Sequence, residues 1–201
     1  INTRLLAACR DLDIPAVGIS GVDAGLIKAH KRPPVLSDTG GTVDYGFVGD
    51  IDEVDASILL KQLDNDLIPI ISPLSADESG TLLNINADTV AAAVAVALEA
   101  EKLILATGAP GILESINDLR SVISYLDIAG LEKLRSEGCL SDGMLPKAAA
   151  IESALAGGVP RVHVISYDLP DSLLLEVFTN EGMGTLVVND IQNLTPAEQQ
   201  G

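Results

Sequence analysis

The chain has 201 residues, of which 12 are Lys or Arg and 29 are Asp or Glu, so its formal net charge is −17. A negative charge of this size repels phosphate backbones and anionic membrane surfaces, which excludes nucleic-acid or membrane binding through a basic face. The residues contain no apolar run of membrane-spanning length and no secretory signal pattern, so we expect a cytoplasmic protein.

Hydrophobic residues make up 47% of the chain, and they are mostly Ala, Val, Ile and Leu. An aliphatic core of this kind is typical of layered α/β proteins, and the length suits one domain over residues 1–201. We expect the polar tail, residues 190–201, to be frayed. Because Ile1 already stands inside an apolar helical pattern, we expect that residues upstream belong to the same protein. Cys9 and Cys139 show no metal-ligand spacing, which indicates buried thiols in a reducing compartment.

The first half of the chain opens with a helix and a strand. Apolar periodicity predicts the helix over residues 1–12, and the next apolar run predicts a buried strand over residues 15–20. Residues 28–49 carry two adjacent prolines and a Ser-Asp-Thr-Gly-Gly run, which indicates a β-hairpin excursion. Asp55 is suited to cap a helix that ends at Leu63.

From Val54 onward the sequence indicates a regular alternation of strands and helices. Residues 67–71 form a strand in which Pro69 favours an edge position or an irregular start. Asn84 or Asn86 is suited to cap an Ala-rich helix that runs to Glu101. The remaining expected elements are a buried strand (102–106), two helices (127–137 and 145–156), a strand (161–165), a helix (172–178) and a strand (185–188). This order predicts an α/β fold with a mostly parallel open sheet and helices on both of its faces.

Three strand-to-helix junctions carry residues suited to chemistry, and ligands of open α/β sheets gather at such junctions. Residues 84–88, Asn-Ile-Asn-Ala-Asp, place two amides and a carboxylate at a helix N-terminus. Residues 106–112 form a Gly/Pro turn after a buried strand, where a nucleotide has room to approach the backbone. In residues 141–147 a Gly-containing loop leads into a helix whose first turn holds Lys147. Each junction also has a purely structural interpretation, as a helix cap, a plain turn and a solvated lysine.

Four segments together resemble the motifs of acetylglutamate kinases, which belong to the amino-acid kinase family. They are the first and third junctions, residues 44–50 (DYGFVGD) and residues 178–185 (FTNEGMGT). The resemblance extends from Ile1 to Val188 and implies the carbamate kinase-like fold of that family. It also implies transfer of the γ-phosphoryl group of ATP to the γ-carboxylate of N-acetyl-L-glutamate in arginine biosynthesis, with Mg²⁺ and in a homo-oligomer.

The resemblance assigns roles to individual residues. Asp88 and Lys147 are the implied catalytic residues, because the family uses this Asp to orient two lysines, of which the other lies upstream. Asn84 and Asn86 are the implied contacts to the substrate. The implied nucleotide-binding residues are Thr107, Gly108, Pro110, Gly111, Ile112, Asp142, Gly143 and Met144. The acceptor carboxylate is already ionised at neutral pH, so this reaction needs positioning and charge neutralisation rather than a general base.

The sequence departs from the family pattern at the nucleotide site. The family usually has Thr-Asp-Val where this chain has Thr107, Gly108 and Ala109, so an acidic side chain is missing. The Gly-Lys-Asp-Gly turn of many members is here Gly-Val-Asp-Ala at residues 21–24, which loses a lysine.

The C-terminal segment resembles the arginine-inhibited members of the family. His163, Glu176 and Gly182 correspond to their effector site, and a carboxylate is the partner that a guanidinium needs. A strand histidine and a helix carboxylate with only structural roles explain the same residues. Two alternatives to acetylglutamate kinase therefore stay open: an aminoadipate or other amino-acid kinase of this family, and a non-catalytic arginine-binding regulatory protein of the same fold.

Overall fold

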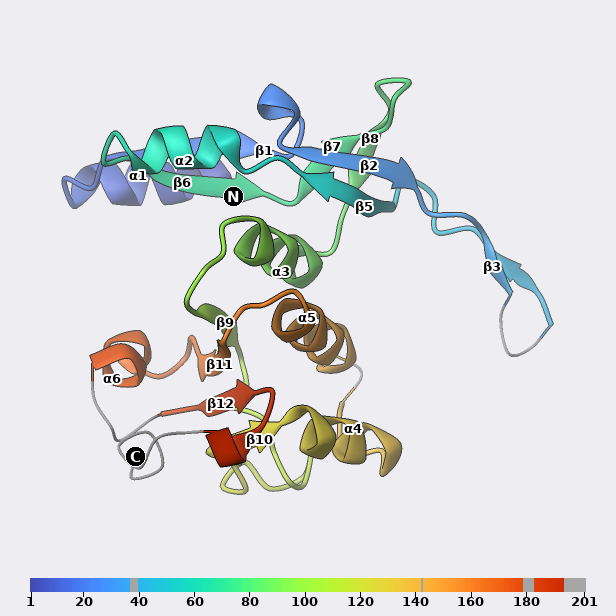
Figure 1. Ribbon diagram of the computed structural model, residues 1–201, viewed down its shortest axis with the longest axis vertical. Coiled ribbons are helices and arrows are strands. Elements are labelled where there is room, and N and C mark those ends of the chain that lie inside the picture. Colours follow the sequence, from blue (N-terminus) through green and yellow to red (C-terminus); the bar gives the residue numbers. More distant parts are fainter. Residues whose placement is uncertain (37–39, 142, 179–182, 194–201) are drawn as a thin grey trace. The chain divides into compact units, whose positions relative to one another are not determined.

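The computed structural model describes residues 1–36, 40–141, 143–178 and 183–193 (Figure 1). It divides into two compact units, which we call the N-terminal unit (residues 1–98) and the C-terminal unit (residues 99–201). The organisation of the chain as a single domain stays a prediction. Of the tail expected to be frayed, residues 194–201 lie outside the described residues, and Ile191–Asn193 form a short 3-10 helix, η2.

The N-terminal unit contains three α-helices, a 3-10 helix and eight short strands within the described residues. The helices are α1 (Asn2–Asp11), η1 (Asp23–Gly25), α2 (Ser57–Leu63) and α3 (Ala87–Ala97). The strands are β1 (Ala16–Ser20), β2 (Ile27–Lys31), β3 (Val35–Leu36), β4 (Thr42–Val43), β5 (Gly49–Val54), β6 (Ile68–Ser72), β7 (Leu74–Ala76) and β8 (Leu82–Asn84). They pair as β1-β6, as β5-β2-β7-β8 and as β3-β4.

The expected edge strand with Pro69 is confirmed. β6 pairs with β1 in parallel, with Pro69 opposite Val17, and within the described residues no second strand pairs with β6. Asn2 ties the start of α1 to this pair, because its Nδ2 donates to the Ile70 carbonyl and to Ser72 Oγ, both at 2.9 Å. The helix thereby lies against both strands.

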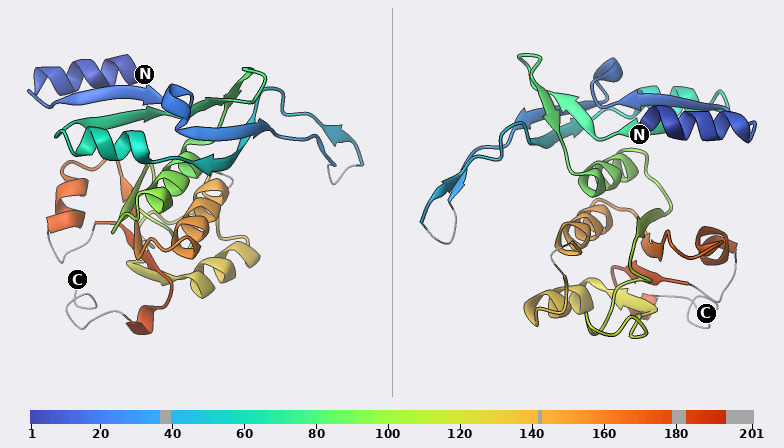
Figure 2. Two further views of the ribbon diagram at one scale, coloured as in Figure 1. Left: turned by 45° about the horizontal axis from the view of Figure 1, so that its top comes forward. Right: turned by 180° about the vertical axis from the view of Figure 1, so that it is seen from behind.

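The expected hairpin excursion is also confirmed. β3 and β4 are antiparallel (Figure 2). Residues 37–39 between them lie outside the described residues. At its base the Arg32 guanidinium forms an ion pair with Asp50, and Arg32 also lies over the ring of Tyr45, 5.8 Å from its centroid.

Two features of this unit were not predicted. β7 and β8 form a hairpin whose turn is held by Asp77 Oδ1, which accepts hydrogen bonds from the backbone N–H groups of Ser79 and Thr81, both at 2.9 Å. The Ala-rich helix was predicted to reach Glu101, which is wrong. α3 ends at Ala97, because Glu99 adopts a left-handed conformation with φ 50° that a helix does not continue.

The C-terminal unit is a mixed sheet with helices on both faces. Its strands are β9 (Leu103–Thr107), β10 (Tyr125–Asp127), β11 (Arg161–Ser166) and β12 (Thr185–Val188), in the order β10-β12-β11-β9. Its α-helices are α4 (Ile128–Ser136), α5 (Leu145–Ala156) and α6 (Ser172–Phe178). The β9-β11 and β10-β12 pairs are parallel and the β11-β12 pair is antiparallel.

The helices of this unit confirm the layered arrangement expected from the sequence. Figures 1 and 2 show α4 and α5 on one face of its sheet and α6 on the other. The core is aliphatic, as predicted, and the side chains of Val162, Val164, Val187, Leu131 and Ile151 are fully buried. In the described residues of both units, no helix is long and apolar enough to cross a membrane.

Candidate functional site

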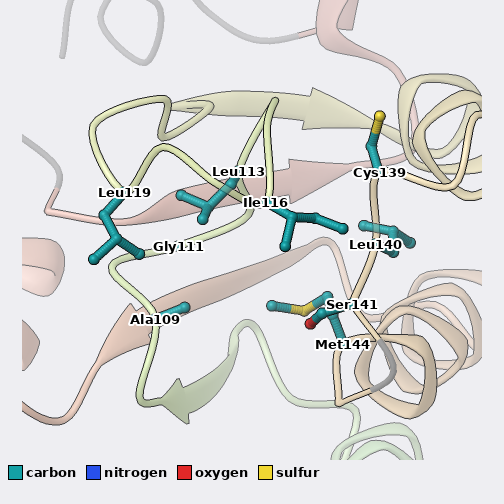
Figure 3. Close-up of a pocket in the computed structure, with 9 residues that line it drawn as sticks. All are labelled: Ala109, Gly111, Leu113, Ile116, Leu119, Cys139, Leu140, Ser141 and Met144. Atoms are coloured by element: carbon teal, nitrogen blue, oxygen red, sulfur yellow. The ribbon is translucent and has the colours of Figure 1, made fainter.

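Two of the segments expected to bind a nucleotide meet at a pocket in the C-terminal unit (Figure 3). The pocket has a volume of ≈ 180 Å³. Gly111, in the segment after β9, and Met144, the N-cap residue of α5, both line it. The lining residues are Ala109, Gly111, Leu113, Ile116, Leu119, Cys139, Leu140, Ser141 and Met144. This mostly aliphatic lining suits a flat aromatic base better than a charged phosphate.

The side chains of the pocket come from opposite sides. Figure 3 shows the Met144 side chain extending into the space between Ala109 and Ile116. Ile116 and Leu119 belong to a loop and expose 44% and 66% of their surface, so the loop presents apolar side chains that the core does not use. Cys139 and Cys9 were expected to be buried, which is wrong: both are free, half-buried cysteines, and Cys9 belongs to α1 of the N-terminal unit.

The other expected nucleotide residues lie next to the pocket in the chain without lining it. They are Thr107 at the end of β9, Gly108 and Pro110 in the turn after it, Ile112 and Gly143. The side chain of Ile112 is fully buried in the core, so Ile112 does not present a side chain to the pocket. Asp142 lies outside the described residues.

The loop that carries Ile116 and Leu119 folds back on itself like a small hairpin. Leu113 and Val122 form an antiparallel bridge, and the Ile123 N–H donates to the Ile112 carbonyl at 2.9 Å. Neither this bridge nor β10 was predicted, because residues 113–124 show no helical or strand periodicity and β10 has only three residues. The bridge is what places Leu113, Ile116 and Leu119 around one pocket.

A buried threonine anchors the start of this loop. Thr185 of β12 is fully buried, and its Oγ1 accepts a hydrogen bond of 2.8 Å from the Ile112 N–H. A β-carbon at Gly111 would lie 2.8 Å from that oxygen and 2.9 Å from Val122 Cγ1, so the close packing of the turn requires glycine.

We expect Thr185→Val to lower the free energy of unfolding by about 1–3 kcal/mol, because it leaves the buried Ile112 N–H without an acceptor while conserving volume. Urea denaturation followed by circular dichroism measures the change. Thr42→Val on the exposed strand β4 is the matched control, for which the midpoint should not move. A Thr185→Val midpoint equal to that of the control would contradict the anchoring role.

The Asn-Ile-Asn-Ala-Asp segment joins β8 to α3 in the N-terminal unit. Asn86 is the N-cap of α3, and its Oδ1 accepts hydrogen bonds from the N–H groups of Asp88 (2.9 Å) and Thr89 (3.1 Å). Its amide oxygen is thus engaged in capping, whereas the exposed side chain of Asn84 extends from the end of β8. Asp88 is half-buried in the first turn of the helix.

Lys147 is half-buried in the first turn of α5, three residues after Met144 of the pocket. Lys147 therefore belongs to the same helix start as the pocket residue Met144, although Lys147 itself does not line the pocket. Asp88 belongs to the N-terminal unit, so a shared cleft for Asp88 and Lys147 stays a prediction.

His163 and Glu176 form a buried pair between β11 and α6. His163 Nδ1 and Glu176 Oε1 are 2.7 Å apart, and the two side chains expose 10% and 5% of their surface. Burial alone would raise the pKa of Glu176, but the hydrogen bond and charge of His163 and the backbone N–H groups of Met183 and Gly184 lower it below its ordinary value. Gly182 lies outside the described residues.

The chain belongs to the amino acid kinase family, whose model matches residues 1–166. This confirms the fold expected from the motifs. The acetylglutamate kinase of Myxococcus xanthus (strain DK1622) is 49% identical over 195 residues, which are 94% of this chain and 63% of that protein. The acetylglutamate kinase of Carboxydothermus hydrogenoformans is 44% identical over 189 residues, or 93% of this chain and 64% of that protein. The chain thus spans a little under two thirds of the length of these relatives.

A solved structure is similar over the same share of the chain. It is the N-acetylglutamate synthase of Neisseria gonorrhoeae complexed with coenzyme A and N-acetyl-glutamate, which is 28% identical and has a TM-score of 0.78 over 94% of this chain and 41% of that one. The same synthase complexed with coenzyme A and L-arginine has a TM-score of 0.73, 24% identity and coverage of 94% and 45%. At that identity the second likeness concerns the fold alone.

Proposed function

We propose that this chain is the nucleotide-binding part of an acetylglutamate kinase, which transfers the γ-phosphoryl group of ATP to the γ-carboxylate of N-acetyl-L-glutamate in arginine biosynthesis. The observation that carries the proposal is the apolar pocket between the Gly/Pro turn after β9 and the start of α5, with Lys147 in the same helix turn. The identity to proteins named acetylglutamate kinase supports this choice within the family.

The residues of the site have distinct tasks in this proposal. The adenine base enters the pocket beside Met144, and the phosphates extend toward the first turn of α5, where the positive end of the helix dipole and the Lys147 ammonium stabilise negative charge. Asn84 contacts the acceptor, and Asp88 orients Lys147 and a second lysine. In a chain with a net charge of −17, such local cations are needed to hold two anions in line.

Mg²⁺ is the metal that ATP transfer implies, and it is usually held by phosphate oxygens with one or two carboxylates. Within the described residues no group of three His, Cys, Asp or Glu side chains is placed to hold a metal by itself. The side chains present therefore fit a metal ion that arrives with the nucleotide. When bound, such an ion would neutralise negative charge on the phosphates. We further propose a cytoplasmic homo-oligomer.

The test is an assay of the full-length protein that measures ADP release with N-acetyl-L-glutamate, with aminoadipate and with no acceptor. We expect release to depend on N-acetyl-L-glutamate. Faster turnover with aminoadipate would assign the protein to the related amino-acid kinases. Release that is absent with every acceptor would overturn the kinase proposal and favour a regulatory binding protein.

Arginine inhibition is a second proposal, favoured by the buried His163 and Glu176 pair. Glu176 Oε1 already interacts with His163, and Oε2 accepts the Met183 N–H at 2.8 Å, so a guanidinium would have to use the remaining lone pairs of this carboxylate. Titrating arginine into the same assay tests the proposal, and turnover that is independent of arginine would contradict it.

A further inference from the structure

The ends of β9 and β11 lie side by side next to the pocket. The two strands are parallel, and their last paired residues are Thr107 and Ser166. The ladder continues for one more hydrogen bond, because the Tyr167 N–H donates to the Thr107 carbonyl at 2.9 Å. This bond fixes the backbone of Tyr167 beside the turn that starts at Gly108. Ala109, the next residue of that turn, lines the pocket.

The side chain of Tyr167 occupies the space above Gly108. A β-carbon at Gly108 would lie 2.9 Å from Tyr167 Oη, 3.5 Å from its Cζ and 3.8 Å from Asp168 Oδ2. Tyr167 exposes 67% of its surface, so its hydroxyl group is not sealed in the core. The phenol oxygen of Tyr167 and a carboxylate oxygen of Asp168 therefore lie beside Gly108, which has no side chain of its own, at the carboxyl ends of two adjacent parallel strands.

We propose that Tyr167 and Asp168 form the polar wall of the nucleotide site and bind the ribose hydroxyl groups of ATP. The inference rests on the proposed function, which places the adenine base in the adjoining apolar pocket. The residue lost at Gly108 is thereby replaced from the neighbouring strand: the absence of a side chain at position 108 is what leaves room for the Tyr167 ring.

Charge decides between the ribose and the phosphates as the partner of this wall. A carboxylate repels phosphate oxygens but accepts hydrogen bonds from hydroxyl groups, and the net charge of −17 adds to that repulsion. Acidic side chains that accept hydrogen bonds from ribose hydroxyls are a general device at the strand ends of α/β folds. The cations of the site, with Lys147 among them, are left for the phosphates.

The test measures binding of MgADP and of Mg-2′,3′-dideoxy-ADP to the full-length protein by calorimetry. We expect the wild type to bind ADP about tenfold more tightly than the dideoxy compound, since the lost hydrogen bonds involve a charged acceptor. Asp168→Asn and Tyr167→Phe should each weaken ADP binding and leave dideoxy-ADP binding almost unchanged. The ratio of the two affinities should therefore fall below the wild-type value. Asp171→Asn, in the same exposed segment, is the matched control and should keep the wild-type preference.

Gly108→Ala provides a second arm, because its methyl group would displace the exposed Tyr167 ring rather than the backbone. We expect Gly108→Ala alone to weaken ADP binding. Added to Tyr167→Ala, it should not weaken ADP binding further, a non-additivity typical of side chains in contact.

The outcomes separate the two proposals. A wild type that does not bind ADP would overturn the proposed function. A wild type that binds ADP, but with a preference that Asp168→Asn and Tyr167→Phe leave intact, would overturn the ribose-binding role alone.

Discussion

Lys147→Ala is expected to lower turnover at least about a hundredfold, which corresponds to roughly 2.7 kcal/mol of transition-state stabilisation. Lys147 lies in the first turn of α5, three residues after Met144 of the pocket proposed for the base, and is half-buried. An ammonium group in this position neutralises charge on the transferring phosphoryl oxygens, and no neutral side chain replaces that interaction. The loss should appear mainly in kcat, because the interaction strengthens as charge develops in the transition state.

The same assay on Lys133→Ala supplies the control. Lys133 belongs to α4 of the same unit, exposes 72% of its side chain and pairs only loosely with Glu137, at 3.9 Å. Turnover of this variant should equal that of the wild type.

Asp88→Ala is expected to lower turnover as much as Lys147→Ala does. In the double variant the two losses should not add, because one residue acts through the other. Unchanged turnover in Lys147→Ala or Asp88→Ala would remove that residue from the mechanism.

Helix ends with strong local signals could be predicted from the sequence residue by residue. α5 begins and ends where expected because Pro146 suits the first turn and Gly157 with Gly158 ends the helix, Gly158 with φ 101°. The β7-β8 hairpin could not be predicted in the same way. Its strands have three residues each, too few for an alternation to be recognised, and its turn depends on a side-chain contact of Asp77.

In the candidate site, too, some residues could be predicted from local sequence patterns, and others depend on contacts between segments distant in the chain. Gly111 and Met144 could be predicted as site residues because Gly/Pro turns and helix starts are visible in the sequence. Ile116 and Leu119 could not, because they reach the pocket only through the bridge between Leu113 and Val122.

The position of Tyr167 likewise depends on long-range pairing. Its side chain meets Gly108 only because β9 and β11 are neighbours in the sheet, an order that periodicity does not contain. Pairings between segments distant in the chain thus supply the part of the site that local patterns leave out.

The second large effect concerns the stability of the C-terminal unit. Glu176→Ala is expected to lower its free energy of unfolding by about 3 kcal/mol at pH 7, because truncation leaves a buried histidine and a backbone N–H without their acceptor. Glu176 accepts from the Met183 N–H at 2.8 Å and lies 2.7 Å from His163 Nδ1, and both side chains of the pair are almost fully buried. Urea denaturation of the full chain measures the loss. Glu132→Gln, exposed on α4, is the control and should leave the midpoint unchanged.

The dependence of this contribution on pH distinguishes the charge of Glu176 from its packing. The pKa of Glu176 is lower in the folded state than its ordinary value of about 4.3, because its hydrogen bonds favour the ionised form more than burial disfavours it. Its contribution is therefore fully present above that value and is lost as the pH falls through the lower pKa of the folded state. The stability difference between wild type and Glu176→Gln should narrow as the pH falls below about 5. A difference that stays constant down to pH 3 would show that Glu176 stabilises the fold through packing alone.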